Sequence, residues 1–353
     1  MDIFQKRWHS IHAKNIEKRE KTSQERLRKY KFKLKETSNK ASKRIHMVVP
    51  SIMHFFKNYH DTVKFIDNIK KHVFEDDKFV FLDFSKCKDI SSEACVVLAA
   101  EIDRCRKKIP DSVSGSYPSN SKVYFLLNEL GFFKLLKIRA TPPTFDDNSE
   151  VDVVKLQSGK ISPRNVTREI EGLFYTKNGE MHVTSYSRRV YPALTEAMGN
   201  ALEHAYPEYF IKKKDKTCVP IWWRAGFKIN KDNRVLIVLY DQGVGIPNTL
   251  HVHWREILEK RATRLGRGLR DDEKIALAME KGRSSTKITG RGIGSYEMQS
   301  LIRESKDGLL SIFSYNGRYI YPSDGEWKKS PLPYRLDGTL VVWQISLDKE
   351  EED

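Results

Sequence analysis

The sequence predicts a mixed α/β protein in which two α/β domains follow a basic helical arm. Short runs rich in Val, Ile, Leu and Phe, at 79–84 and 235–240, have the length and composition of buried strands. Other segments carry apolar residues at helical spacing, and the turn-rich segment 141–149 separates the two halves. A chain of 353 residues, 39% of them hydrophobic, is long enough for two packed cores. We therefore expect an arm at 1–45, a first domain at 46–140, a linker with edge elements at 141–165 and a second domain at 166–353.

The first domain is expected to alternate strands and helices. A strand at 79–85 is followed by a helix that includes 94–103, then by a strand at 113–117. The apolar residues of 119–136 repeat at helical spacing and predict a further helix. After the linker, 151–156 is expected to form an edge strand of the second domain.

The segment 195–206, rich in Ala, Leu, Met and Glu, predicts a helix in the second domain. Glu196, Asn200 and His204 are spaced four residues apart, so they share one polar face of it. The side-chain oxygen of Asn suits Mg²⁺, which also keeps water and phosphate oxygens, and the carboxylate of Glu196 can act as a general base. The alternative is an ordinary solvated helix face, on which Glu and Asn are common.

Asp241 closes the apolar run 235–240, and Gly243 and Gly245 follow it. The glycines permit a tight turn and let the backbone approach a flat ligand closely. A buried Asp at a strand end can accept a hydrogen bond from an exocyclic amine such as that of adenine. The alternative is a simple strand-to-loop turn, for which Asp and Gly are also the expected residues.

A glycine-rich loop, Gly290-Arg291-Gly292-Ile293-Gly294, precedes a segment predicted to be helical, 295–302. Free N–H groups at a helix start, together with the helix dipole, form a phosphate site. The loop is neither a Walker A loop, since no Gly-Lys-Ser/Thr follows, nor a Rossmann fingerprint, since no short strand precedes it. A final strand is expected at 337–345, beginning at Gly338-Thr339.

In this order and at these separations, the four segments resemble the nucleotide-binding region of the GHKL ATPases over roughly 166–347. This superfamily includes gyrase-type topoisomerases, a heat-shock chaperone, histidine kinases and mismatch-repair ATPases. The resemblance implies binding of ATP and Mg²⁺, with Glu196 as the catalytic carboxylate, Asn200 as the Mg²⁺ ligand and Asp241 as the acceptor of the adenine amine. It implies further ATP-binding roles for His204, Gly243, Gly245, Lys287, Gly290, Arg291, Gly292, Ile293, Gly294 and Thr339.

The same resemblance makes 248–289 an ATP lid that contains a helix at 271–281, with the basic Arg283 and Lys287 close to the phosphate loop. The helix at 195–206 is most similar to that of the anti-sigma-factor serine kinases. Those enzymes also carry a Glu four residues before the Asn and a His four residues after it.

Residues 47–138 resemble the later part of a STAS domain, the fold of anti-sigma-factor antagonists, because a Leu-Asp-Phe-Ser strand leads to a serine at a helix start. Ser92 stands where the antagonists carry a phosphorylatable serine. Its neighbours differ from the antagonist pattern, since Ser91 replaces an Asp and Glu93-Ala94 replace Ser and Gly. We therefore favour the alternative that these serines cap the next helix. Bacterial chains that fuse a STAS-like module to a GHKL ATPase are known.

The cysteine pattern and the lengths of the apolar runs indicate the cellular compartment. Cys87, Cys95, Cys105 and Cys218 form no CxxC motif or pairing with His, which favours a reducing cytosol and argues against structural zinc. The charged N-terminus lacks the apolar segment of a signal peptide, and no apolar run approaches membrane-spanning length. We therefore expect a cytoplasmic protein.

The net charge of +16 is concentrated in the arm, where residues 1–45 hold fifteen Lys and Arg against five Asp and Glu. Thr22-Ser23-Gln24-Glu25 resembles a capping box, and Leu27, Tyr30 and Leu34 share a helical face, so we expect a basic helix. Its partner can be nucleic acid, an acidic protein or an anionic membrane, and the alternative is a solvated arm.

We expect the arm to bind nucleic acid weakly and without sequence preference. Counterion release makes such binding steeply salt-dependent, with a logarithmic slope of about −0.9 per phosphate neutralised on duplex DNA. Deleting residues 1–45 should flatten this slope in a fluorescence-anisotropy titration and leave ATP affinity unchanged. Equal slopes with and without the arm would place the contact surface elsewhere, and no binding at low salt by either form would favour protein docking.

The sequence thus predicts an ATP-hydrolysing regulatory switch that signals to an unidentified protein partner through lid closure. A dimer is a reasonable expectation, and a role in regulation or in defence against mobile DNA would suit such a switch. Two alternatives remain: a serine/threonine kinase of the anti-sigma type, and a non-hydrolysing scaffold that uses ATP only to order the lid.

Overall fold

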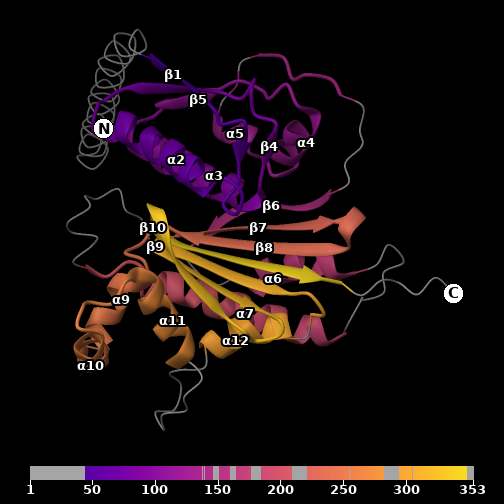
Figure 1. Ribbon diagram of the computed structural model, residues 1–353. Coiled ribbons are helices and arrows are strands. Elements are labelled where there is room, and N and C mark those ends of the chain that lie inside the picture. The colour runs from indigo at the N-terminus through magenta and orange to yellow at the C-terminus, as the bar shows by residue number, and fades with distance from the viewer. Residues whose placement is uncertain are drawn as a thin grey trace, which may run out of the picture.

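The computed structural model describes residues 44–136, 138, 140–145, 151–159, 164–175, 184–208, 221–253, 255–281, 294–303 and 305–347. It has a mixed α/β fold with both parallel and antiparallel sheets, which confirms the predicted class (Figure 1). Of the predicted basic arm, only Arg44 and Ile45 are described, and they begin the first strand. None of the helices in the described ranges has the length and apolarity that crossing a bilayer requires.

Residues 44–136 form what we call the N-terminal layer. Its sheet consists of three parallel strands in the order β1-β3-β5, and β2 pairs separately with β4. The elements are β1 (Arg44–Val48), β2 (Ile52–Met53), α2 (Tyr59–Phe74), β3 (Phe79–Asp83), β4 (Asp89–Ile90), α3 (Ser92–Lys108), β5 (Val113–Gly115), α4 (Ser121–Glu129) and α5 (Phe133–Leu136). The strand and helix expected at 79–85 and 94–103 are therefore present, whereas α2 was not anticipated.

The prediction of a single helix at 119–136 is wrong, because the segment forms two helices, α4 and α5. Gly131, between them, has a φ of +75°, a left-handed conformation that an L side chain rarely adopts. Its N–H bonds to the carbonyl of Asn128, and the chain turns before Phe133. The apolar spacing holds on both sides of the break, so periodicity alone did not reveal it.

A second sheet of five antiparallel strands has the order β6-β7-β8-β10-β9. Its strands are β6 (Val151–Gly159), β7 (Trp222–Ile229), β8 (Arg234–Asp241), β9 (Leu309–Pro322) and β10 (Lys328–Ser346). Among the described strands, β6 pairs only with β7, which confirms the predicted edge strand. The final strand was predicted too short, because β10 begins at Lys328 and includes Gly338 in an irregular stretch of its pairing with β9.

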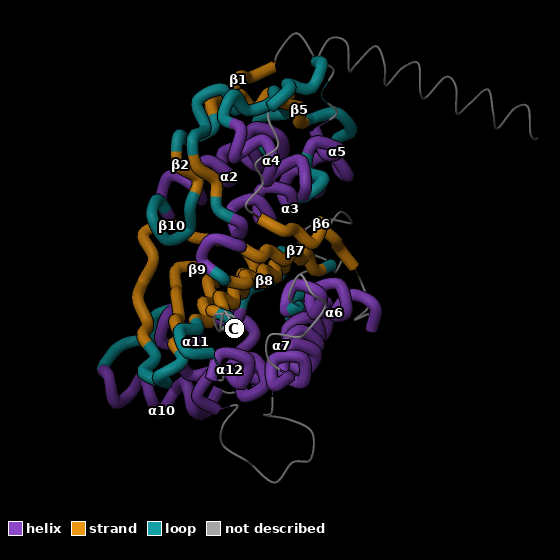
Figure 2. The backbone as a smooth tube through the Cα atoms, turned by 90° about the vertical axis from the view of Figure 1, so that its right-hand side faces the viewer, coloured by secondary structure: helices purple, strands orange, loops and turns teal. Residues whose placement is uncertain are grey.

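Side chains that alternate along each strand pack against two different helical layers. On β8, Leu236, Val238 and Tyr240 face α2 and α3, while Ile237 and Leu239 face the opposite layer. The opposite layer and its extensions consist of α6 (Arg164–Glu171), η1 (Gly172–Phe174), α7 (Thr184–Glu203), α9 (Ile246–His253), α10 (Arg255–Leu265), α11 (Asp271–Lys281) and α12 (Gly294–Arg303), with η2 (Asn230–Asp232) joining β7 to β8 (Figure 2).

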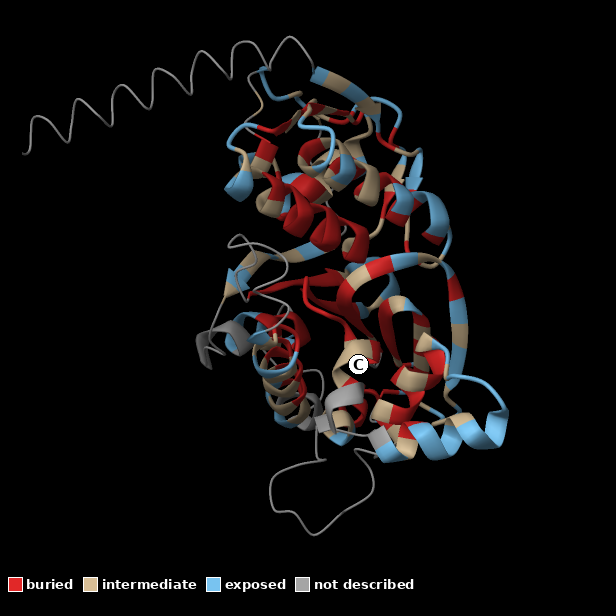
Figure 3. Ribbon diagram, turned by 90° about the vertical axis from the view of Figure 1, so that its left-hand side faces the viewer, coloured by how far each residue is buried: buried red, intermediate tan, exposed pale blue. Residues whose placement is uncertain are grey.

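The N-terminal layer and the antiparallel sheet share one apolar core. Helix α3 contacts β5 on one side and β7, β8 and β10 on the other. Phe55 and Tyr59 pack against Phe313 of β9 with ring centroids 5.5 and 6.0 Å apart. Buried positions are concentrated where these helices meet the strands (Figure 3). The two predicted domains are therefore joined by close packing.

Ser91 caps α3, which agrees with the capping role that the sequence favoured over a phosphorylation site. Its backbone is extended and its hydroxyl accepts a hydrogen bond from the N–H of Ala94 at 3.4 Å. Ser92 is the first residue of the helix, and it precedes Glu93, whose buried carboxylate lies 3.3 Å from Nδ1 of His54. A phosphate on Ser92 would bring a second negative group beside that carboxylate.

We expect Ser91→Ala to lower the free energy of unfolding by about 1 kcal/mol, because a cap is lost. The matched variant Ser92→Ala should change it by no more than about 0.5 kcal/mol. Denaturant titration measures both values. Intact-mass spectrometry after incubation with Mg·ATP should show no added phosphate, and a phosphopeptide that maps to either serine would contradict this expectation and favour the kinase alternative.

Candidate functional site

The long helix α7 carries the predicted catalytic and magnesium-binding residues. Nδ2 of Asn200 donates a hydrogen bond to Oε1 of Glu196 at 3.1 Å, one helical turn away. The buried side of the helix is formed by Val190, Leu194, Ala197, Met198 and Ala201, which pack on the sheet and on α12. The pair is therefore held at the edge of the packed layer. Because Nδ2 is engaged and no described group donates to Oδ1, that oxygen of Asn200 is available to a cation.

The surroundings of Glu196 shift its pKa above the ordinary value. Burial raises the pKa of Glu196, the hydrogen bond from Asn200 and the nearby His204 act in the opposite direction, and the negative charges of Glu203 and Glu297 raise it further. Glu297 belongs to the first turn of α12, which packs along α7. A carboxylate with a raised pKa is a stronger base once it is ionised.

His204 was expected on the same helix as Glu196 and Asn200, but α7 ends at Glu203. The His204 N–H still bonds to the carbonyl of Asn200 at 3.1 Å, so the residue continues the helical turn without belonging to the helix. Its side chain is exposed and lies near enough to influence Glu196. The expected face therefore brings two residues into direct contact and the third only into electrostatic range.

Asp241 lies at the end of β8, buried and paired with Thr339 of β10. Its Oδ1 accepts a hydrogen bond from the N–H of Gly243 at 2.8 Å. Burial raises the pKa of Asp241 to about 7, although favourable interactions with Gly243 and with the hydroxyl and backbone of Thr339 act in the opposite direction. The structure therefore brings the predicted threonine hydroxyl to the predicted aspartate.

Ser314 of β9 is a buried residue of this site that the sequence did not reveal. Its hydroxyl donates to the carbonyl of Gly338 at 2.8 Å, lies 3.3 Å from the Thr339 hydroxyl and accepts from the N–H of Ile246 at 3.1 Å. It thereby ties three segments together. No local pattern in Ile-Phe-Ser-Tyr-Asn marks this serine, because its partners come from distant strands.

Glycine is required at two positions here for steric reasons. A Cβ on Gly243 would lie 2.2 Å from the carbonyl oxygen of Ala205, and one on Gly338 would lie 1.9 Å from that of Asp241. Gly338 also has a φ of +81°, and Gly245 has a φ of +73°. These distances show that the loop after β8 lies directly on the end of α7 and on β10.

Hydrogen bonds join the loop after β8 to the end of α7. The Val244 N–H donates to the Ala205 carbonyl at 2.7 Å, and the Gln242 N–H donates to the hydroxyl of Tyr206 at 2.8 Å. That hydroxyl in turn donates to the carbonyl of Ile221 at 2.9 Å. Asn200 lies in the last turn of α7, three residues before its end at Glu203, and Ala205 follows that end by two residues. Asp241 and the loop that follows it are therefore joined to the segment just after the Glu196–Asn200 pair, and we treat them as one candidate site.

Three buried polar atoms next to these residues have no hydrogen-bond partner in the described part of the chain: Thr195 Oγ1, Gln242 Nε2 and Ser295 Oγ. Buried polar groups are normally paired, so water or a bound polar ligand can supply the partners of these atoms. Among the described residues, no group of three His, Cys, Asp or Glu side chains could hold a metal ion. An ion at Asn200 would depend on water and phosphate oxygens, as Mg²⁺ commonly does.

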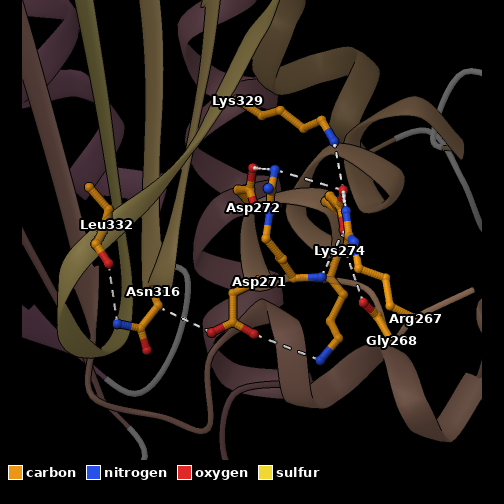
Figure 4. Close-up of polar contacts among 10 residues, drawn as sticks. Arg267, Gly268, Asp271, Asp272, Lys274, Asn316, Lys329 and Leu332 are labelled. Carbon is orange, nitrogen blue, oxygen red and sulfur yellow. Dashed lines mark hydrogen bonds and ion pairs between the residues drawn. The ribbon is translucent and has the colours of Figure 1, made fainter. Parts of the chain in front are cut away.

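The predicted helix at 271–281 is present as α11, but it is anchored to the sheet. Asp271 accepts a hydrogen bond from the N–H of Asn316 at 3.2 Å, and Glu273 lies 3.5 Å from Nζ of Lys329 (Figure 4). Arg267 forms two hydrogen bonds with Glu273 and lowers the pKa of that carboxyl to about 2. Ile275, Ala276, Leu277 and Met279 of this helix are buried. Within the predicted lid, α11 is therefore packed against the antiparallel sheet.

Several predicted site residues lie outside the described residues: Lys287, Gly290, Arg291, Gly292 and Ile293, together with Arg283 of the predicted lid and Cys218. Gly294 is the first residue of α12, so the predicted helix after the glycine-rich loop is present. The other cysteines, Cys87, Cys95 and Cys105, are free and buried, and burial raises their pKa.

A scan against protein-family models and a search of curated proteins returned no match to the chain.

Proposed function

We propose that the chain binds Mg·ATP and hydrolyses it as a GHKL-type ATPase, and that it passes the nucleotide state to a protein partner. One observation supports this most strongly: a buried Asp241 paired with Thr339 is joined, through the following loop and Ala205, two residues after α7, to the helix of the Glu196–Asn200 pair. In the proposed site, Asp241 would accept the amine at one end, and Glu196 and Asn200 would supply a base and an amide oxygen at the other.

In the proposed complex, the ionised carboxylate of Asp241 accepts a hydrogen bond from the adenine amine, and Gly243 and Gly245 shape the loop against the base. Asn200 would hold Mg²⁺ through Oδ1, and the ion, when bound, would neutralise phosphate charge. The start of α12 at Gly294 offers backbone N–H groups to the phosphates. Of these groups, Oδ1 of Asn200 receives no hydrogen bond from a described residue.

Glu196 removes a proton from a water molecule in the proposed reaction. The water oxygen forms a bond to the γ-phosphorus as the bond from that phosphorus to the bridging oxygen breaks, giving ADP and phosphate. The raised pKa of Glu196 suits this step, because the proton is transferred to a stronger base.

Incubation with γ-labelled ATP separates this function from its alternatives. Hydrolysis releases free labelled phosphate, a serine/threonine kinase transfers the label to protein, and a scaffold retains intact nucleotide. We expect free phosphate to dominate, since Glu196 can activate water. Retained intact ATP or labelled protein as the main product would replace the hydrolase with the corresponding alternative.

A further inference from the structure

Lys70, Glu101, Tyr240 and Asp337, which we call the Tyr240 cluster, meet where the N-terminal layer contacts the antiparallel sheet. The hydroxyl of Tyr240 donates one hydrogen bond that is shared between Oε1 of Glu101, at 3.1 Å, and the carbonyl of Asp337, at 2.9 Å. Nζ of Lys70 lies 3.0 Å from Oδ2 of Asp337. Thus α2 and α3 each supply one charged side chain, while β8 and β10 supply the other two residues.

The cluster is charged, and two of its members are buried while Lys70 and Asp337 are partly exposed. Tyr240 and Glu101 are each 1% exposed, and burial, with the charges of Glu101 and Asp337, raises the pKa of Tyr240. Burial alone would lower the pKa of Lys70, but the carboxylates of Glu101, Asp337 and Asp67 raise it overall. The ammonium and the hydroxyl therefore keep their protons at neutral pH. Buried polar groups at these distances have little freedom to rearrange.

The cluster lies on the opposite face of the sheet from the Asp241–Thr339 pair, the candidate site for the adenine base. Tyr240 precedes Asp241, and Asp337 is two residues before Thr339, the partner of Asp241 across the sheet. Since successive side chains point to opposite faces of a strand, Tyr240 faces α3 while Asp241 faces the α7 side. The two residues share one stretch of backbone, so a shift of one is transmitted to the other.

Gly338 brings the backbone of β10 into direct contact with the backbone of Asp241. It lies between Asp337 and Thr339, in left-handed backbone against the carbonyl of Asp241. The Tyr240 hydroxyl holds the Asp337 carbonyl from one face of the sheet, and the Ser314 hydroxyl holds the Gly338 carbonyl from the other. The backbone that carries Thr339 is thus fixed from both sides.

We propose that Tyr240 and Glu101 are positioning residues for the Asp241–Thr339 pair, and that through them the N-terminal layer regulates nucleotide affinity. This inference rests on the proposed function. A partner or modification that displaces α3 would move Glu101, change the position of the Tyr240 hydroxyl and thereby loosen the backbone that carries Thr339. By linkage, nucleotide binding must affect α3 to the same extent.

Tyr240→Phe tests the proposal, since it removes the hydroxyl and keeps the ring in the core. We expect the affinity for ATP to fall roughly three- to tenfold, as for one lost positioning hydrogen bond. Affinity for inorganic triphosphate should not change, because that ligand has no base. The pKa of Asp241, measured by carboxyl ¹³C NMR, should rise as the favourable interaction with Thr339 weakens. Glu101→Gln should shift both quantities in the same direction.

Tyr321→Phe is the matched control, because its buried hydroxyl on β9 accepts a hydrogen bond from Nε of Arg303 at 2.9 Å, away from the cluster. An equal loss of ATP affinity in this control would show a general effect of stability and overturn the proposal. Hydrogen exchange of α3 should slow with ATP in the wild type and respond less in Tyr240→Phe.

The outcomes separate this inference from the function on which it rests. If the wild type binds ATP but Tyr240→Phe leaves both affinity and the pKa of Asp241 unchanged, the coupling is wrong and the nucleotide site stands. If the wild type does not bind ATP, the proposed function fails, and regulation of nucleotide affinity fails with it.

Discussion

Replacing Glu196 by alanine should lower ATP turnover by about 10²–10⁴-fold, the usual contribution of a general base, and leave Mg·ATP affinity nearly unchanged. The reason is that the Glu196 carboxylate acts only on the attacking water in the proposed mechanism. Steady-state phosphate release and equilibrium titration with labelled nucleotide measure the two quantities separately. Asn200→Ala should instead weaken Mg·ATP binding itself, because it removes the side-chain oxygen available to the ion.

Glu203→Ala provides the control for Glu196→Ala. Glu203 is exposed, is the last residue of α7 and also influences the pKa of Glu196, so its removal deletes one nearby negative charge but no proposed base. Turnover of this variant should remain within a few-fold of the wild type. Unchanged turnover in Glu196→Ala would remove Glu196 from the mechanism, and equal losses in both variants would indicate an electrostatic rather than a basic role.

The local parts of the candidate site could be predicted from the sequence. The spacing of Glu196 and Asn200 defined one helical face, and the structure places them in hydrogen-bond contact. The apolar run before Asp241 defined a buried strand, and β8 ends at that residue. These predictions succeeded because helix periodicity and strand composition are properties of a few consecutive residues. The bounds of α11 were predicted for the same reason.

The parts that depend on distant contacts could not be predicted. Ser314 and Tyr206 are polar residues in apolar surroundings, and their importance appears only when β9, β10 and the end of α7 come together. The packing of α3 between two sheets could not be predicted either, because an apolar helix face does not indicate which element it packs against. Gly131 ended α4 through a backbone conformation that side-chain spacing does not record.

The affinity for adenine nucleotides should increase with pH up to about pH 7 and then level off. Burial raises the pKa of Asp241 to about 7, and the ionised carboxylate is the form that accepts the adenine amine. Below that pKa, binding must first remove a proton, which lowers affinity by about tenfold per pH unit. Isothermal titration with ADP measures the trend, and inorganic triphosphate controls for ionisation of the phosphates. An affinity that falls as pH rises would mean that the protonated acid contacts the base.

Asp241→Asn should lower ATP affinity by roughly 100-fold, because an amide donor would face the adenine amine where a charged acceptor is needed. The same variant isolates the effect of this carboxyl on stability. The pKa of Asp241 is higher in the folded protein than its ordinary value of 3.8, so its stabilising contribution is complete below about pH 4 and is lost as pH rises through 7. Relative to Asp241→Asn, the wild type without nucleotide should therefore lose about 4 kcal/mol of unfolding free energy between pH 4 and pH 8. Denaturant titrations of both proteins across that range measure the difference, and a difference independent of pH would show that Asp241 ionises normally in the folded protein.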